Sequence, residues 1–440
     1  MLLHMSGKTD ADPFAVRTMT SHGEEIAFSD PYVSDQQRAA AGRETVAERM
    51  RALLPANRRR AEAAYAAGGL PDGQEVVRVW CPRDAAGLRE RLGDSRYAAW
   101  AEDDVLHVLW RGAAEQVVLG GGIQVPLWPV EGTVSAGTTG PAGTTGSAET
   151  GEGLWEASVR VRRLDEAVIT VMVIGLGAAD LPFGRPATDT MTWRGPRAPA
   201  EPADTEGPVG LAGEVREHTI ESAPLRGPRG VTVYVPPGAA GAPAPLPGCV
   251  LADGQSVPGF ARVLEPAITS GAVPPVVLVG VHSAGGYADR SDLRAQEYLP
   301  RHRPRRFAAH LSFVIDEVIP WAAASLPVDP PGPSRRWLAG GFSNGAAWAI
   351  GAAQRRPEVF GGVAAFSAGV VPRRVAGASR DVRHHLAAGT LEEGFRRATL
   401  EWATRLGRAG VPCSHHEWPG GHDPFWWNLT LPDALAWLLA

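Results

Sequence analysis

One short stretch in the C-terminal third of the chain restricts the fold more than any other. Residues 337–342 read Trp-Leu-Ala-Gly-Gly-Phe, a run typical of a buried parallel strand, and Ser343, an asparagine and Gly345 follow. The mostly small residues 346–353 then predict a compact helix. A strand, a sharp turn and a helix in this order predict an elbow with Ser343 at its apex. Gly341 and Gly345 fit this prediction, because such a tight turn leaves no room for Cβ atoms.

Apolar strands alternate with helices throughout residues 214–440. The expected strands lie at residues 231–235, 249–251, 276–281, 337–340, 363–366 and 385–388. Helices are expected between most of them, for example at residues 306–324 and 393–408. This alternation predicts an α/β domain with a mainly parallel sheet covered on both faces. Ligands of such sheets bind at the carboxyl ends of the strands, where Ser343 would lie.

The preceding residues, 71–195, have the shorter period of an all-β domain. The expected strands lie at residues 105–110, 117–119, 157–161 and 168–174, with no helices between them. This pattern predicts a small β-sandwich of the Ig-like type. Residues 133–153 are rich in Gly, Thr and Ala and predict a flexible surface loop.

The two predicted domains are flanked by simpler segments. Residues 1–70 are partly helical in pattern, and Thr45 with Glu48 has the spacing of a capping box. The proline-rich residues 196–213 predict a linker before the α/β domain.

The composition excludes several classes of function. A net charge of −5 and a pI near 6.2 argue against a nucleic-acid partner. Cys81, Cys249 and Cys413 are far apart, so they form neither a disulfide framework nor a metal site, which favours a reducing cytoplasm. The N-terminal residues have no apolar core of a signal peptide, and no stretch approaches eighteen apolar residues. We therefore expect a cytoplasmic protein without a membrane span, metal or organic cofactor.

The best candidate for a base near Ser343 is His422. It lies in Pro-Gly-Gly-His-Asp, residues 419–423, after a predicted final strand at residues 414–418. A serine hydroxyl becomes a good nucleophile only when a neighbouring base accepts its proton. The two motifs together predict a serine hydrolase, although a glycine-rich turn with an incidental serine and a surface histidine remain the simpler alternatives.

The acid that orients the histidine should lie between the two, after the penultimate strand. Glu392 is the first candidate and Glu393 the second, and either could instead cap the helix that follows. For the oxyanion, the backbone N–H of Asn344 is one candidate donor. The loop holding Gly254 and Gln255 supplies the second candidate, and an ordinary turn is the alternative.

A combination of motifs in residues 214–440 is typical of one known family. The motifs are Asp253-Gly254-Gln255, Arg294-Ala295-Gln296-Glu297-Tyr298, the helix at 313–321, the elbow at 340–345, Gly389-Thr390-Leu391-Glu392 and Gly420-Gly421-His422-Asp423 with Trp427. Through them the chain resembles the enterochelin esterase family, an esterase branch of the α/β hydrolases. The segment 75–175 is more loosely similar to the family's N-terminal β-domain.

The resemblance implies a catalytic role for Ser343, His422 and Glu392 in cleaving ester bonds of a ferric catecholate siderophore, such as a triserine lactone, so that iron enters only with the substrate. Some members work with a serine–histidine dyad, which leaves the acid open. A bulky aromatic anion suits arginine and aromatic side chains at the pocket mouth. The candidates are Arg290, Arg294, Arg373, Arg374 and Trp427, the last with a core position as its alternative.

Two other functions remain open at this point. One is a general carboxylesterase or acyltransferase, because one fold hosts many substrates. The other, of a different class, is a non-catalytic binding protein that retains the fold. The sequence predicts no oligomeric state.

Overall fold

The computed structural model divides the chain into two compact units. It describes residues 15–22, 24–28, 35–81, 83–114, 116–131, 153–176, 189–201, 210–285, 293–330, 332 and 337–440. Unit 1 comprises Met1–Pro199 and the short segment Pro419–Asp423, and unit 2 comprises Ala200–Trp418 and Pro424–Ala440. The chain thus passes between the units within the predicted linker, and the segment that bears His422 groups with unit 1. The predicted loop at 133–153 lies outside the described residues except for Gly153.

Unit 1 begins with a small hairpin and two helices. The strands β1 (Arg17–Ser21) and β2 (Glu24–Phe28) pair antiparallel and are followed by α1 (Asp35–Ala40) and α2 (Val46–Ala66). The predicted capping box is confirmed, because the Glu48 N–H donates to Thr45 Oγ1 at 3.0 Å and the Thr45 N–H donates to Glu48 Oε2 at 2.8 Å.

The remaining strands of unit 1 form one continuous antiparallel sheet in the order β10-β9-β6-β7-β8-β5-β4, with β3 paired to β8. The elements are β3 (Val76–Val79), α3 (Ala85–Leu92), β4 (Tyr97–Glu102), β5 (Val105–Gly112), β6 (Gln116–Gly121), β7 (Pro126–Pro129), β8 (Gly153–Val161), β9 (Val168–Leu176) and β10 (Asp189–Arg194).

This sheet curls back on itself. Asp189 lies in β10, the first strand of this order. It accepts a hydrogen bond from the indole of Trp110 in β5 at 2.7 Å and forms an ion pair at 3.5 Å with Arg96, which directly precedes β4, the last strand. The prediction of an Ig-like sandwich is therefore not confirmed. Local periodicity identified several of the strands, but pairing between distant strands decides whether they form two sheets or one barrel-like sheet.

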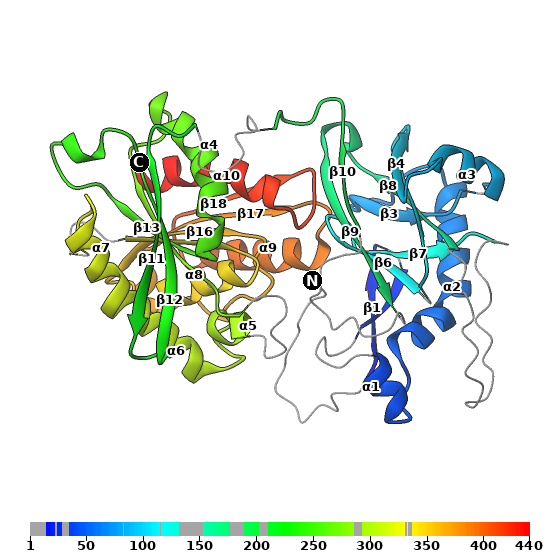
Figure 1. Cartoon of the computed structure of the whole chain (residues 1–440), viewed down its shortest axis with the longest axis horizontal. Coiled ribbons are helices and arrows are strands. Elements are labelled where there is room, and N and C mark those ends of the chain that lie inside the picture. The colour runs from blue at the N-terminus through cyan, green and yellow to red at the C-terminus, as the bar shows by residue number, and fades with distance from the viewer. Residues whose placement is uncertain are drawn as a thin grey trace. The chain divides into compact units, whose positions relative to one another are not determined.

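Unit 2 is built on one mixed sheet (Figure 1). Its strands follow the order β11-β12-β14-β13-β15-β16-β17-β18. Its strands are β11 (Glu214–Ser222), β12 (Gly227–Val235), β13 (Gly248–Ala252), β14 (Val277–Val281), β15 (Trp337–Phe342), β16 (Phe360–Phe366), β17 (Arg383–Gly389) and β18 (Cys413–Trp418). The first two pairs of neighbours in this order are antiparallel, and every later pair is parallel. The strand β11 was not predicted, because it lies at the edge of the sheet and only Val215 and Ile220 among its residues are apolar.

The helices of unit 2 cover both faces of this sheet. They are α4 (Val257–Thr269), α5 (Leu293–Tyr298), α6 (Pro304–Ser312), a π-helical turn (Phe313–Val318), α7 (Ile319–Ser325), α8 (Asn344–Arg355), α9 (Glu393–Arg408) and α10 (Pro424–Leu439). Two neighbouring residues of β17 show the arrangement. The ring of His384 packs against Trp402 of α9, and that of His385 packs against Trp437 of α10. Successive side chains of a strand point to opposite faces, so α9 and α10 cover opposite faces, as Figure 1 also shows.

Both of these histidines are buried, His384 at 0% and His385 at 1% exposure. Neither ring reaches solvent, because helices cover the sheet on both faces at this strand.

Among the described residues, one helical run has the length and mean hydropathy of a membrane span. It is Pro304–Ser325, in which the most apolar stretch of eighteen residues has a mean hydropathy of 1.2 and half of its residues buried within the protein. Its apolar residues, including Phe307, Phe313 and Val318, belong to the core cluster of unit 2. The packing of this run is that of a core helix.

Buried neutral histidines make the stability of unit 2 depend on pH. Burial lowers the pKa of His384 to about 3, and neither ring nitrogen has a hydrogen-bond partner among the described residues. In the unfolded chain the pKa of a histidine is about 6.5, so the unfolded state binds one more proton between these two values. Stability then falls as pH falls below about 6.5, by up to about 1.4 kcal/mol per pH unit.

We predict that His384→Phe, which keeps a flat ring against Trp402, makes the Tm of unit 2 fall less steeply between pH 7 and pH 5. Calorimetry at several pH values measures this directly. An identical pH dependence of Tm in the variant and the wild type would show that His384 does not cause the loss of stability at low pH.

Candidate active site

The turn between β15 and α8 has the geometry of a strained elbow. Ser343 lies between the two elements with φ 56° and ψ −124°, a backbone conformation that residues other than glycine rarely adopt. Its N–H donates to the carbonyl oxygen of Phe366 at the end of the neighbouring strand β16, at 2.9 Å. Such a conformation costs on the order of 1–3 kcal/mol and persists only where the surroundings impose it.

Two glycines allow this turn to pack. A Cβ atom on Gly341 would lie 2.7 Å from the carbonyl carbon of Gly345. A Cβ atom on Gly345 would lie 3.0 Å from the Cβ of Ala252 and 3.1 Å from Asp253 Oδ2. The end of β15 and the first turn of α8 therefore approach more closely than side chains would allow, as the sequence motif predicted.

Glu392 follows the end of β17 by three residues and is buried, at 5% exposure. Its Oε1 accepts hydrogen bonds from Ser367 Oγ and from the backbone N–H of Gly389, both at 2.6 Å. Although Glu392 occupies the N-cap position of α9, its side chain makes no capping hydrogen bond. Glu393 is the first residue of α9 and is exposed, which suits an acid at a helix N-terminus.

His422 lies between the end of β18 at Trp418 and the start of α10 at Pro424, in the segment that groups with unit 1. Contacts with unit 1 fix this segment on both sides of the histidine. Gly420 forms a parallel bridge with Val168, and the Thr170 N–H donates to Asp423 Oδ2 at 2.9 Å. A Cβ on Gly421 would lie 1.9 Å from the carbonyl oxygen of Gly122. Sequence reasoning gave no role to these contacts, because residues more than 240 positions apart leave no local pattern.

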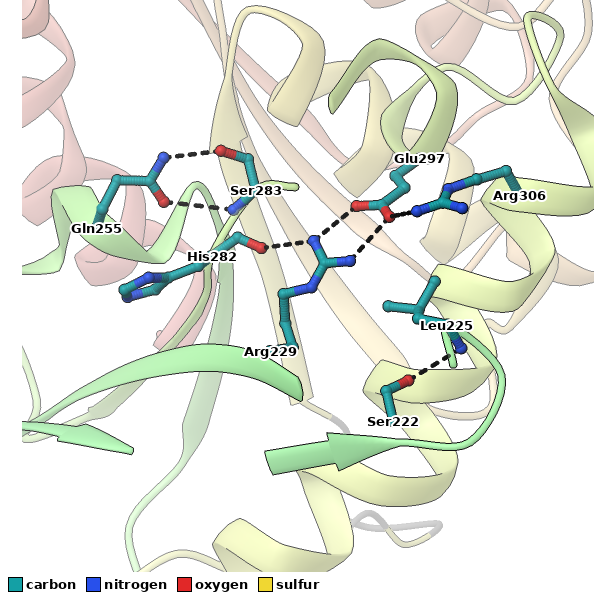
Figure 2. A network of polar contacts seen from close by, with 8 residues as sticks. All are labelled: Ser222, Leu225, Arg229, Gln255, His282, Ser283, Glu297 and Arg306. Atoms are coloured by element: carbon teal, nitrogen blue, oxygen red, sulfur yellow. Dashed lines mark hydrogen bonds and ion pairs between the residues drawn. The ribbon is translucent and has the colours of Figure 1, made fainter. Parts of the chain in front are cut away.

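The candidate oxyanion donors differ in how far their side chains are engaged. Asn344 is the first residue of α8, and the N–H groups of a helix's first turn have no intrahelical acceptor. Gly254 packs directly on the next strand, because a Cβ there would lie 2.1 Å from Gly280 O. The amide of Gln255 is bonded to Ser283, donating to Oγ at 2.8 Å and accepting from the N–H at 3.4 Å (Figure 2). For Gln255, therefore, the backbone N–H and not the side-chain amide is the candidate oxyanion donor.

Arg294 of α5 is paired with Asp253, which directly precedes Gly254 and Gln255 in the loop after β13. Its guanidinium donates to both carboxylate oxygens of Asp253, at 2.7 and 2.6 Å, and the Asp253 N–H donates to Tyr298 Oη at 2.9 Å. Asp253 is 3% exposed and has φ 59°, so its backbone also lies in the left-handed region. Burial and the Asp253 charge raise the pKa of Tyr298 well above its usual value, so its hydroxyl stays protonated. These contacts tie the Asp253 loop to Arg294 of α5.

A second ion-pair network anchors the helix that bears Arg294. Glu297 of α5 is fully buried and accepts two hydrogen bonds from Arg229 of β12, each at 2.9 Å, and one from Arg306 at 3.0 Å (Figure 2). The motif Arg294-x-x-Glu297-Tyr298 thus connects the sheet with the Asp253 loop. A buried carboxylate with two guanidinium partners avoids the cost of an unpaired charge.

The other predicted ligand-binding residues have different surroundings. Arg290 lies outside the described residues. Arg373 and Arg374 are exposed, in the segment that follows β16. Trp427 is 5% exposed and stacks on Phe342, with ring centroids 4.2 Å apart and planes 8° apart, so it offers little surface to a ligand. Among the described residues, no group of three or more His, Cys, Asp or Glu side chains is arranged to hold a metal ion.

The comparisons with known proteins agree with this architecture. Residues 222–438 match the model of the family described as “Putative esterase”. No curated protein sequence matches the chain. The enterobactin esterase from Shigella flexneri, solved in the presence of enterobactin, aligns over 79% of this chain and 97% of its own, with a TM-score of 0.54 and 16% identity. The ferric enterobactin esterase from Salmonella typhimurium aligns over 80% and 98%, with a TM-score of 0.53 and 17% identity.

The fold of this chain is therefore α/β-hydrolase-like, and the protein is a carboxylic ester hydrolase. Residues 222–438 fall within the esterase family that this model describes.

We predict that Arg294→Ala destabilises the protein by about 1–3 kcal/mol, because it leaves the buried Asp253 carboxylate without its partner. The free energy of unfolding in urea measures this. Arg356→Ala is the matched control, since it removes an exposed arginine–carboxylate pair, with Glu358, and should change stability by about 0.5 kcal/mol or less. Unchanged stability together with a raised KM for Arg294→Ala would instead make Arg294 a ligand-binding residue.

Proposed function

We propose that the protein is a serine esterase in which Ser343 is the nucleophile, His422 the general base and Glu392 the acid that orients the imidazole. We further propose that its substrate is an ester of a catecholate siderophore. The observation that carries the first proposal is the strained backbone of Ser343 at the glycine-packed elbow. Strain of this kind, retained by a hydroxyl-bearing residue between a parallel strand and a helix, is typical of a nucleophile.

The topology of unit 2 supports the choice of partners. Ser343 and Glu392 follow strands β15 and β17, which both run parallel to β16, so the ends of all three strands lie at one edge of the sheet. The segment of His422 follows β18, which is parallel to β17. The burial of Glu392 and the exposure of Glu393 favour Glu392 as the acid.

The proposed reaction has two balanced halves. Ser343 Oγ attacks the ester carbonyl carbon while His422 accepts the hydroxyl proton, and the N–H groups of Asn344 and of the Gly254–Gln255 loop stabilise the oxyanion. The bond from the carbonyl carbon to the alcohol oxygen then breaks, and the imidazolium returns its proton to the leaving alcohol. Water then attacks the acyl-enzyme while His422 accepts its proton. The imidazolium returns that proton to Ser343 Oγ, which releases the carboxylic acid product and restores the serine.

Two observations support a catecholate ester as the substrate class. The solved structures that align over about four-fifths of this chain include an esterase solved in the presence of enterobactin and, separately, of 2,3-dihydroxy-N-benzoyl-serine. In addition, Arg373 and Arg374 are exposed in the segment after β16 and supply positive charge suited to an aromatic anion.

We predict that the purified protein cleaves enterobactin and its ferric complex with a kcat/KM at least about tenfold above that for p-nitrophenyl butyrate, since only the larger substrate uses binding energy away from the reacting bond. Ser343→Ala should lower kcat for all three substrates by about a thousandfold or more. Ser270→Ala is the matched control, because Ser270 is exposed and its hydroxyl only donates to Ala267 O, so activity should be unchanged.

Each other result has a definite meaning. Cleavage of p-nitrophenyl butyrate alone identifies a general carboxylesterase and contradicts the siderophore proposal, as does acyl transfer to an added alcohol in place of hydrolysis. Full activity of Ser343→Ala overturns the assignment of the nucleophile.

A further inference from the structure

A buried chain of contacts connects the end of the Ser343 strand with the Glu392 carboxylate. The indole of Trp427, in α10, stacks on the ring of Phe342, the residue directly before Ser343. The same indole donates from Nε1 to Ser367 Oγ at 2.8 Å, and Ser367 Oγ donates to Glu392 Oε1 at 2.6 Å.

Except for Phe342, the residues that make these contacts are almost completely shielded from solvent. Ser367 is 0% exposed, Trp427 5% and Glu392 5%. Hydrogen bonds between such groups are not weakened by competing water, and those that involve a carboxylate are stronger than those between neutral groups. The hydroxyl of Ser367 has one proton to donate, and because the indole N–H is a donor only, the hydroxyl must give that proton to the carboxylate. The direction of the chain is therefore fixed from Trp427 to Ser367 to Glu392.

The backbone of Ser367 is also constrained. It directly follows β16 and has φ 54°, in the left-handed region, and its N–H donates to Ala387 O at 2.8 Å. A glycine would relieve this strain, but it would also remove the hydroxyl. The two strained serines follow adjacent parallel strands, since the N–H of Ser343 donates to Phe366 O directly before Ser367.

We propose that Ser367 and Trp427 are positioning residues of the esterase: together they fix Glu392 relative to the elbow that bears Ser343. This inference rests on the proposed roles of Ser343 and Glu392. Its physical basis is preorganisation. A carboxylate held by two donors on one oxygen keeps a defined orientation, and a misplacement of about 1 Å in such a site can reduce the rate about a hundredfold.

The first test compares Ser367→Ala with Ser367→Gly, using p-nitrophenyl butyrate as the substrate. Both variants remove the hydroxyl, but only glycine also removes the backbone strain. We expect both to lower kcat by about ten- to a hundredfold with KM changed less than about twofold, because the acid is misplaced while the ester still binds. Wild-type kcat in Ser367→Gly would overturn the proposal.

The second test isolates the indole N–H. Trp427→Phe keeps an aromatic ring that stacks on Phe342 but removes the donor to Ser367, and we expect kcat to fall by about three- to tenfold. The matched control is Trp402→Phe, since Trp402 is equally buried and its indole N–H has no hydrogen-bond partner among the described residues. Equal kcat in the two variants would contradict a specific role for Trp427.

The third test separates positioning from a general loss of stability. In a Glu392→Gln background, Ser367→Gly should lower kcat by less than about twofold further, because both changes remove the same function. Additive losses, or wild-type kcat in Glu392→Gln itself, would overturn the proposal. If Ser343→Ala is inactive while the Ser367 variants are as active as the wild type, only this inference fails and the proposed function stands.

Discussion

The close packing of Gly341 against Gly345 is the constraint on which the candidate site depends. It allows β15 to end and α8 to begin within one residue, which holds Ser343 in its strained conformation. The strain is balanced by the hydrogen bond from Ser343 N–H to Phe366 O and by the burial of α8 against the sheet. A side chain at Gly341 would push β15 away from α8, and one at Gly345 would push α8 away from Ala252 and Asp253 after β13. Either change would displace the serine.

Around this elbow, the loops that follow the strands are held by charge and by hydrogen bonds. The Asp253 loop is fixed by Arg294 and Tyr298, and α5, which carries both, is anchored by the pairing of Glu297 with Arg229. In each pair the carboxylate is the more deeply buried partner, so its charge requires the arginine. Within unit 1, the segment that carries His422 is held by the hydrogen bond from the Thr170 N–H to Asp423 Oδ2.

The sequence predicted the parts of this structure that depend on local pattern. The elbow, the capping box at Thr45 and the helix α9 follow from spacing and composition within a few residues. Non-local pairing was not predictable in this way. The curled sheet of unit 1 depends on contacts such as that of Trp110 with Asp189, and the polar edge strand β11 resembles a loop in sequence. The contacts of Arg294 with Asp253 and of Trp427 with Ser367 join residues 41 and 60 positions apart, so they left no local pattern in the sequence.

The proposed function requires an activated hydroxyl at Ser343. Mass spectrometry of the whole protein and of its peptides, after reaction with a fluorophosphonate that modifies activated serines, measures this activation. We expect one adduct per chain, on the peptide that contains Ser343. An unmodified protein, or an adduct on another residue with Ser343 intact, would contradict it.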